Sequence, residues 1–273
     1  MTLHSRLMTL LALATLAGTL IAAPETLTTA PANAPATAPA TAPKVQLPIP
    51  PADQPTVRVD NTGKPSEGWL KHHEANVKLA QKGNIDLYFE GDSITDGWTG
   101  NAGQKIWTEE FAAWHPGNFG ISGDHTEHVL WRLAHGELDG VSPKAYVLMI
   151  GTNNRAAKTS SIEQIAHGVE LIVRKFQEHS PNAKILVLAI FPRGATPTDI
   201  QRQQNDAVNK LIAKLDDGKN VKFLDIGQKF LEADGNLPKD IMPDLLHPNE
   251  KGYQIWAEAI KPTLTEWLGA PAK

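Results

Sequence analysis

Five short apolar runs recur along the chain, separated by stretches with the spacing of amphipathic helices. The runs are IDLYFEG (85–91), GNFGIS (117–122), AYVLMIG (145–151), KILVLAIF (184–191) and VKFLDIG (221–227). Their almost continuous apolar character is typical of strands that are covered on both faces, as in a parallel sheet. We therefore expect five buried strands.

Helical spacing is found between these runs. The helices are expected at 69–81, 102–114, 124–135, 161–179, 199–215 and 249–268. In the fourth, Ile162, Ile165, Val169 and Ile172 recur on one helical face. Alternation of strands and helices at this spacing predicts an open, mainly parallel α/β sheet with helices on both faces.

Ligands of such sheets bind outside the carboxyl ends of the strands, so the residues just after each run are the candidate site. They include a serine, glycines with free backbone donors and an amide side chain. In chain order they are Asp92 and Ser93, then Ser122, Gly123 and Asp124, then Gly151, Thr152, Asn153 and Asn154, then Pro192 and Arg193, and finally Asp225.

Ser93 has two interpretations. A short polar side chain at the start of a helix often caps the free backbone N–H groups, so Ser93 could be only a cap. A serine hydroxyl can instead be a nucleophile, but it then needs a base, most often a histidine oriented by a carboxylate. Asp92 is expected to hold the Ser93 turn through backbone hydrogen bonds. Arg193 could contact substrate or form a structural salt bridge.

Among the ten histidines, His247 is the best candidate base. It follows a long irregular stretch and precedes Pro248, a residue suited to the first turn of a helix. Asp244 lies three residues earlier, where it could orient the imidazole or merely cap the helix entry. The fragment alone leaves these two roles open, and the presence of Ser93 and the amide cluster favours catalysis.

The other histidines are weaker candidates for the base. His72 and His73 fall in the first helix and are expected at solvated positions. His125 and His128 are three apart with Glu127 between them, which superficially suggests metal ligands. HTEH lacks the spacing of HExxH and has no obvious third ligand, so we expect no metal site.

The N-terminal part of the chain differs in composition from the rest. Leu7 to Ile21 is almost wholly apolar and small residues follow, which predicts a signal peptide over 1–23 and a secreted or periplasmic protein; an uncleaved membrane anchor is the alternative. Residues 24–55 are rich in Ala, Pro and Thr and are expected to form an extended linker. The catalytic domain is expected over 56–273. There is no Cys, so no disulfide supports the fold.

Charge argues against nucleic acid as a partner. The chain has 26 Lys and Arg against 30 Asp and Glu, and its net charge is −4. Nucleic-acid binding usually needs a basic surface, which this composition does not provide.

Four sequence blocks, in order, resemble those of the SGNH or GDSL hydrolases. They are GDSI at 91–94, Gly123 within NFGISGD, GTNN at 151–154 and DLLH at 244–247. The segments NFGISGDHTEHVLWRLAHGEL, SPKAYVLMIGTNN and FPRG are similar, more narrowly, to the catalytic subunits of platelet-activating-factor acetylhydrolase and their bacterial relatives. The resemblance implies a three-layer α/β/α sandwich around a five-stranded parallel sheet.

The resemblance also implies a role for each matching residue. Ser93 would be the nucleophile, His247 the general base and Asp244 the group that orients it. The oxyanion hole would be formed by the N–H groups of Ser93 and Gly123 and by the side chain of Asn153. Ser122 departs from the pattern of this subgroup, in which glycine is found at this position. No metal or organic cofactor would be needed.

These observations predict a secreted serine esterase for short-chain, above all acetyl, esters. The substrate would be a small ester or an acetylated glycan, with no stable membrane insertion after signal cleavage. An acyltransferase or a lysophospholipase-like enzyme using the same residues is an alternative. A glycan-binding module without turnover is an alternative of another class, as is a phosphate cradle at Gly117, Gly120 and Gly123, whose spacing does not match the dinucleotide fingerprint.

Overall fold

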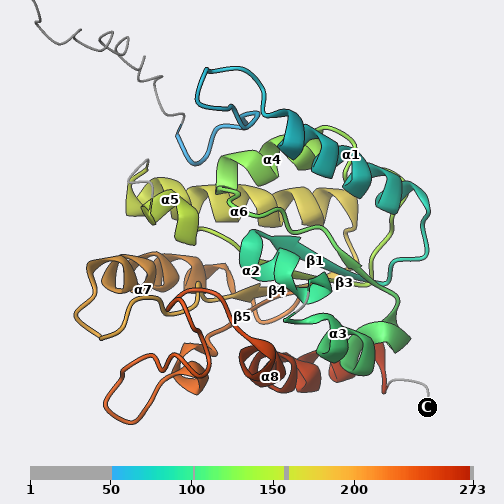
Figure 1. Cartoon of the computed structure of the whole chain (residues 1–273). Helices are drawn as coiled ribbons and strands as arrows, with labels where there is room; N and C mark the ends of the chain where they lie inside the picture. The colour runs from blue at the N-terminus through green and yellow to red at the C-terminus, as the bar shows by residue number, and fades with distance from the viewer. Residues whose placement is uncertain (1–50, 101, 157–159, 271–273) are drawn as a thin grey trace, which may run out of the picture. The chain divides into compact units, whose positions relative to one another are not determined.

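A computed structural model describes residues 51–270, apart from 101 and 157–159 (Figure 1). A five-stranded sheet forms its centre, with strand order β2-β1-β3-β4-β5 and parallel pairing throughout. The strands are β1 Leu87–Gly91, β2 Pro116–Asn118, β3 Ala145–Met149, β4 Lys184–Leu188 and β5 Val221–Leu224. All five predicted apolar runs contain or overlap a strand, so the predicted α/β fold is confirmed.

The strand order creates a switch point between β1 and β3. From β1 the chain moves outward to β2 on one side, and it then returns to form β3 on the other side of β1. Phe89 of β1 consequently lies between Asn118 of β2 and Val147 of β3. Connections leave in opposite directions at such a point, which opens a crevice at the carboxyl ends of the strands.

Helices cover both faces of the sheet (Figure 1). Tyr88 points into one apolar cluster, whereas its neighbours Leu87 and Phe89 point into the other, as the alternation of side chains along a strand requires. The first face is covered by α1 Glu67–Gln81, α4 Thr126–Ala134, α6 Ile162–His179 and α7 Ile200–Ile212, and the second by α3 Gln104–Phe111 and α8 Glu250–Leu268.

Polar residues fix where the long helices begin. Ser161 accepts from the backbone N–H of Gln164 ahead of α6, Asp199 accepts from Gln201 ahead of α7, and Asn249 accepts from Gly252 ahead of α8. Each bond satisfies a backbone donor that has no partner within its helix. The predicted helix starts consequently agree with the structure to within a residue or two.

The sequence pattern did not separate the shortest helices. The structure contains α2 Ser93–Asp96 and α5 Thr152–Ala156, which follow β1 and β3 directly, and the 3₁₀ turns η1 Gly97–Thr99, η2 Ala112–Trp114, η3 Ala213–Leu215 and η4 Gly227–Phe230. Helices of one turn are too short to show a hydrophobic period. α2 begins at Ser93 and α5 begins next to Asn153, two of the candidate site residues.

The predicted signal peptide and residues 24–50 of the predicted linker lie outside the described residues. Residues 51–55 are described, and Ala52 is fully buried: its N–H donates to Ser160 Oγ, and its carbonyl oxygen accepts from Thr126 Oγ1. Ordered contacts with the domain therefore begin ahead of Thr56. In the described part of the chain, no helix combines the length and the apolar character that crossing a bilayer needs.

Candidate active site

The turn that carries Ser93 is held by hydrogen bonds and close packing. Asp92 caps α2 by accepting from the N–H of Ile94 at 3.0 Å, as its expected structural role requires. Gly91 ends β1 where a Cβ would lie 2.3 Å from Thr95 Oγ1 and 2.4 Å from Met149 O, so this position has no room for a side chain. Ser93 is consequently placed at the carboxyl end of β1, beside the switch point.

A line of hydrogen bonds connects Ser93, His247 and Asp244. The Ser93 Oγ lies 2.8 Å from His247 Nε2, and His247 Nδ1 lies 2.6 Å from Asp244 Oδ2. A carboxylate only accepts, so Nδ1 carries the proton and Nε2 is free to accept from the serine hydroxyl. Residues separated by 154 positions in the chain thus form the arrangement needed to activate a serine.

Asp244 both caps the turn and orients the imidazole, which the sequence left as alternatives. Its Oδ1 accepts from the backbone N–H groups of Leu246 and His247, while Oδ2 accepts from the ring. Leu245 adopts a left-handed conformation with φ of 62°, uncommon for a residue with a branched side chain. Partial burial raises the pKa of Asp244, but the hydrogen bonds from His247 outweigh this and hold the pKa below its ordinary value.

The last helix ties the nucleophile turn to the histidine turn. Tyr253, in the first turn of α8, donates from its hydroxyl to the carbonyl oxygen of Ile94 at 2.7 Å. α8 begins only three residues after His247. The same helix therefore contacts both sides of the Ser93–His247 hydrogen bond.

Gly123 and Asn153 lie next to one another at this edge of the sheet. Asn153 Nδ2 donates to the carbonyl oxygen of Asp124 at 3.0 Å, which places its amide against the residue that follows Gly123. The loop is attached to the end of β1 because the N–H of Ile121 donates to the carbonyl oxygen of Gly91. Gly123 has a φ of 80°, a conformation that favours glycine.

Ser122 and Arg193 both have structural partners. Ser122 Oγ donates to Asp96 Oδ2 at 2.6 Å, which links the Gly123 loop to α2. Arg193 Nη1 donates to the carbonyl oxygen and to Oγ1 of Thr152. Arg193 thus supports the start of α5 through hydrogen bonds, rather than through the salt bridge considered from the sequence.

A buried charge cluster contacts the Gly123 loop through Asp124, and the sequence pattern did not predict it. Arg132 is fully buried and bonds with Glu90, Asp124 and Glu137. Burial raises the pKa of Asp124 to about 6 and that of Glu90 well above its ordinary value. The available signal was Glu90 itself, a charged residue inside the apolar run IDLYFEG.

His73 is buried, contrary to the expectation from the sequence. It was expected at a solvated position, but only 6% of its surface is exposed. Its Nε2 lies 3.1 Å from the carbonyl oxygen of His135, and its ring stacks on Trp69. One face of α1 packs against the end of α4. The burial of His73 results from this tertiary contact, which the helical spacing of α1 does not reveal.

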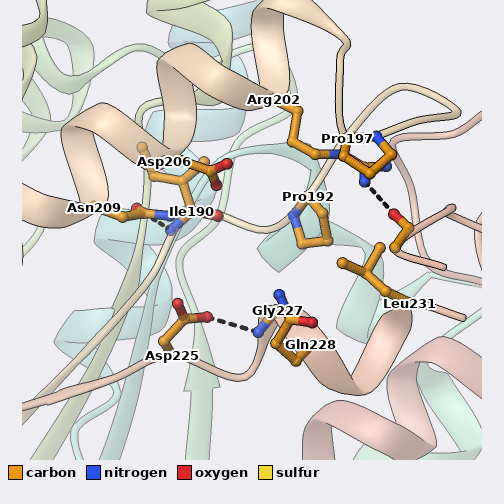
Figure 2. A pocket seen from close by; sticks show the side chains of 11 residues that line it. Ile190, Pro192, Pro197, Arg202, Asp206, Asn209, Asp225, Gly227, Gln228 and Leu231 are labelled. Carbon is orange, nitrogen blue, oxygen red and sulfur yellow. Dashed lines mark hydrogen bonds between the residues drawn. The ribbon is translucent and has the colours of Figure 1, made fainter. Parts of the chain in front are cut away.

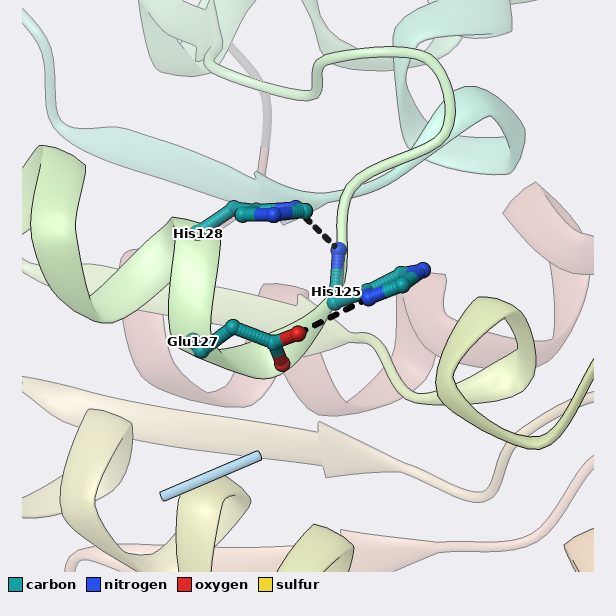
Figure 3. A group of neighbouring side chains, drawn as sticks. All are labelled: His125, Glu127 and His128. Atoms are coloured by element: carbon teal, nitrogen blue, oxygen red, sulfur yellow. Dashed lines mark hydrogen bonds and ion pairs between the residues drawn. The ribbon is translucent and has the colours of Figure 1, made fainter. Parts of the chain in front are cut away.

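His125, Glu127 and His128 form a cluster whose ligand atoms all lie within 4.8 Å of one another (Figure 3). Both carboxylate oxygens of Glu127 and the Nδ1 atom of each histidine already have protein partners. His128 Nδ1 accepts from the backbone N–H of His125, and Glu127 accepts from His125 Nδ1 and from Asn154 Nδ2. A cation here would replace these bonds, and it would meet the positive charges of Arg58 and Arg132, both close enough to lower the pKa of His128. The geometry favours a hydrogen-bonded helix start over a metal site.

A cavity of about 140 Å³ lies at the carboxyl ends of β4 and β5 (Figure 2). Its polar lining includes Asp206, Asn209 and Asp225. Asn209 binds both backbone polar groups of Ile190, and Asp225 accepts from the N–H of Gly227. Neither Ser93 nor His247 is among the residues that line this cavity. The cavity is therefore separate from the hydrogen-bonded Ser93, His247 and Asp244.

Comparison with known proteins decides the family. Residues 89–255 match the model of the GDSL-like lipase/acylhydrolase family, a span that includes Ser93, Asp244 and His247. The chain belongs to this family. It is therefore an ester hydrolase, as the sequence blocks predicted.

Family relatives include platelet-activating factor acetylhydrolase IB subunits. The human alpha2 subunit is 38% identical over 204 residues, which cover 74% of this chain and 85% of the relative. The human alpha1 subunit is 35% identical over 219 residues, which cover 80% of this chain and 91% of the relative. The resemblance noted in the sequence thus extends over most of both chains.

Solved structures of the same fold come from bacterial proteins. A GDSL-like lipase from Bacteroides thetaiotaomicron aligns with a TM-score of 0.59 at 20% identity, covering 73% of this chain and 98% of the other. A catalytic mutant of an acetylxylan esterase from Geobacillus stearothermophilus aligns with a TM-score of 0.55 at 18% identity, covering 70% and 97%. At these identities the likeness concerns the fold.

Proposed function

We propose that this chain is a secreted serine esterase that removes short acyl groups, above all acetyl, and that its substrates are O-acetylated carbohydrates. The observation that carries the mechanism is the hydrogen-bonded line from Ser93 Oγ through His247 to Asp244. The acetyl preference is supported by the names of the relatives, which are acetylhydrolase subunits. Secretion is supported by the apolar N-terminal segment of the sequence.

The reaction proceeds in two halves. Ser93 Oγ forms a bond to the ester carbonyl carbon, its proton passes to His247 Nε2, and the carbonyl electron pair moves onto oxygen. When the tetrahedral intermediate collapses, the bond to the alcohol breaks and the alcohol takes the proton from Nε2. Water then repeats both steps on the acyl-enzyme, which releases the acid and restores Ser93.

Each remaining candidate has a role in this cycle. The N–H groups of Ser93 and Gly123 and the amide of Asn153 donate to the oxyanion, where preorganised donors have their largest effect on rate. Asp244 keeps the proton of the neutral ring on Nδ1 and stabilises the imidazolium. About 42% of the His247 side chain is exposed, so water can reach the ring from solvent.

The test compares wild type with Ser93→Ala on a graded panel. It contains p-nitrophenyl acetate, butyrate and octanoate, acetylated xylooligosaccharides and an acetylated ether phospholipid. We expect acetyl esters to be hydrolysed fastest, acetylated oligosaccharide to be preferred to phospholipid, and Ser93→Ala to lose all but background turnover. A fluorophosphonate should label wild type at Ser93 and leave the variant unlabelled.

The alternatives predict other results on the same panel. An acyltransferase would transfer the acetyl group to an added sugar acceptor faster than to water, which product analysis detects. A lysophospholipase-like enzyme would prefer the long-chain esters. A glycan-binding module would bind the oligosaccharide, turn over no ester and resist the fluorophosphonate, and this result would overturn the proposed mechanism.

A further inference from the structure

Residues 52–66, which we call the N-terminal strap, cross the start of α4 on their way to α1. The strap is hydrogen-bonded to the first residues of α4. Its Ala52 carbonyl oxygen accepts from Thr126 Oγ1 at 2.6 Å, and the N–H of Thr56 donates to the carbonyl oxygen of Glu127 at 3.0 Å. A small antiparallel bridge between Val59 and Pro65 closes its far end. The strap lies outside residues 89–255, which match the family model.

Arg58 reaches from the strap to the loop that contains Gly123. Its Nη1 donates to the carbonyl oxygen of Ser122 at 2.7 Å. A Cβ placed on Gly123 would lie 2.9 Å from Nη2 and 3.0 Å from Nη1 of the same guanidinium. The planar head of Arg58 therefore lies directly against Gly123.

The bonded carbonyl and the candidate oxyanion donor belong to one peptide unit. The carbonyl of Ser122 and the N–H of Gly123 share the same amide, whose two ends polarise one another. A cation that binds the oxygen draws electron density towards it and makes the N–H a stronger donor. Arg58 thus acts on the side of the peptide opposite to the oxyanion, and it does not need to touch the substrate.

Arg58 binds the Ser122 carbonyl without being held in a salt bridge to any described residue. Within residues 51–270, as far as they are described, no acidic side chain forms an ion pair with Arg58. His128 lies close enough to interact with Arg58, and it adds no charge because burial, assisted by the adjacent positive charges, lowers its pKa to about 2. Arg58 therefore contributes a positive potential at Gly123, the sign that favours a developing oxyanion.

We propose that Arg58 is a positioning residue of the esterase, which holds and polarises the Ser122–Gly123 peptide and so strengthens the oxyanion hole. This inference rests on the proposed function, because it assumes that the Gly123 N–H faces the oxyanion. The strap is then part of the active site rather than the end of a tether. The competing role is purely mechanical, in which Arg58 only attaches the strap to the domain.

The test compares Arg58→Met, which removes the charge and the donors at similar length, with Arg58→Lys, which keeps a charge. Lys64→Met is the matched control, because Lys64 is exposed on the same strap. For p-nitrophenyl acetate we expect kcat of Arg58→Met to fall about 10-fold or more, with KM nearly unchanged. This decrease is smaller than the one expected when a whole oxyanion donor is removed. Arg58→Lys should recover part of kcat, and Lys64→Met should equal wild type.

A second measurement separates polarisation from attachment. Butylboronic acid adds to a serine hydroxyl: the B–O bond forms, the proton passes to the histidine, and the boronate carries the negative charge of the intermediate. Its dissociation constant should rise in Arg58→Met by about the factor by which kcat falls. If Arg58→Met folds and binds the boronic acid as tightly as wild type, the role is mechanical and the proposal is wrong.

The outcomes for the proposed role of Arg58 differ from those for the proposed esterase function. If Arg58→Met does not fold, the comparison rests on Arg58→Gln, which removes the charge but keeps a side-chain donor; its kcat and boronic acid affinity should fall together, and wild-type values for both would overturn the inference. Failure of the proposed function has a different signature, since wild type and Ser93→Ala would then be equally inactive. An active wild type, an inactive Ser93→Ala and an unimpaired Arg58→Met would reject only the role of Arg58.

Discussion

Arg132 Nη2 donates to Glu90 Oε1 at 2.7 Å, and neither side chain has any exposed surface. The same guanidinium binds Asp124, whose carbonyl oxygen accepts from Asn153, and the carbonyl oxygen of Phe119. One buried cation thus connects the end of β1 with the loop that precedes α4. The loop that contains Gly123 is bound by Arg132 through Asp124 and by Arg58 through the carbonyl oxygen of Ser122.

Removal of the buried cation should destabilise the fold strongly. Arg132→Met leaves Glu90, Asp124 and Glu137 together without a positive partner, and we expect a loss of about 3–5 kcal/mol in the free energy of unfolding. Urea denaturation measures this loss. Lys105→Met is the matched control, because Lys105 pairs with Glu250 at the surface and should contribute about 1 kcal/mol or less. Equal losses for the two substitutions would show that the buried cluster contributes no more to the free energy of unfolding than a surface ion pair.

His128 should make stability depend on pH below about 6.5. Burial lowers its pKa in the folded state from 6.5 to about 2. Between these values the unfolded chain binds a proton that the folded chain does not, so stability falls as the pH decreases. His128→Gln removes this contribution, and the stability difference between variant and wild type should change by roughly 1.4 kcal/mol per pH unit at most.

The comparison of variant with wild type is needed because other groups act in the opposite direction. Burial raises the pKa of Asp92 to about 7, so the folded state keeps a proton there that the unfolded state loses above pH 3.8. Denaturation of both proteins at pH 5 and 7 isolates the histidine. A stability difference that is the same at both pH values would contradict the buried, neutral state of His128.

Asp244→Asn should separate the two functions of this carboxylate. An asparagine Oδ1 can still accept from the N–H groups of Leu246 and His247, but its amide group cannot accept from Nδ1 of the ring. We therefore expect a nearly unchanged melting temperature and a fall in kcat of up to about 10,000-fold, as for loss of the correct tautomer in a serine triad. Esterase kinetics near wild type would mean that Asp244 is only a cap.

Asn153→Ala should lower kcat by about 100- to 1,000-fold, because it removes the proposed side-chain donor to the oxyanion. KM should change little, since the bond strengthens mainly in the transition state. Asn182→Ala, at an exposed amide far along the chain, is the control and should be neutral. A kcat within a few-fold of wild type would exclude Asn153 from the oxyanion hole and leave it a loop anchor for Asp124.

Pattern and chemistry anticipated much of the fold. Apolar runs such as AYVLMIG predict buried strands reliably, because strands covered on both faces need apolar residues at nearly every position. Caps such as Ser161, Asp199 and Asn249 marked the helix starts because backbone donors there need local partners. The predicted site edge followed from topology, and Ser93, Gly123 and Asn153 all lie there because parallel strands end at the same edge.

Other features depended on contacts between distant segments. Glu90 interrupts an apolar strand, but nothing near it in sequence identifies Arg132 as its partner. His73 was expected in solvent because an adjacent histidine pair on a helix does not reveal which member faces a neighbouring helix. Arg58 stands beside a stretch whose composition resembles a linker, so its approach to Ser122 could not be anticipated.

The sequence by itself determined the α/β class, the family blocks and the chemical types available at the carboxyl edge, since periodicity and short motifs are local properties of the chain. Only the tertiary structure decided that Asp244 caps and orients at once, that Arg132 is enclosed by three carboxylates, and that Arg58 lies against Gly123. The physical reason is that hydrogen bonds and charges act over a few ångströms in space, and folding alone determines which distant residues come within that range.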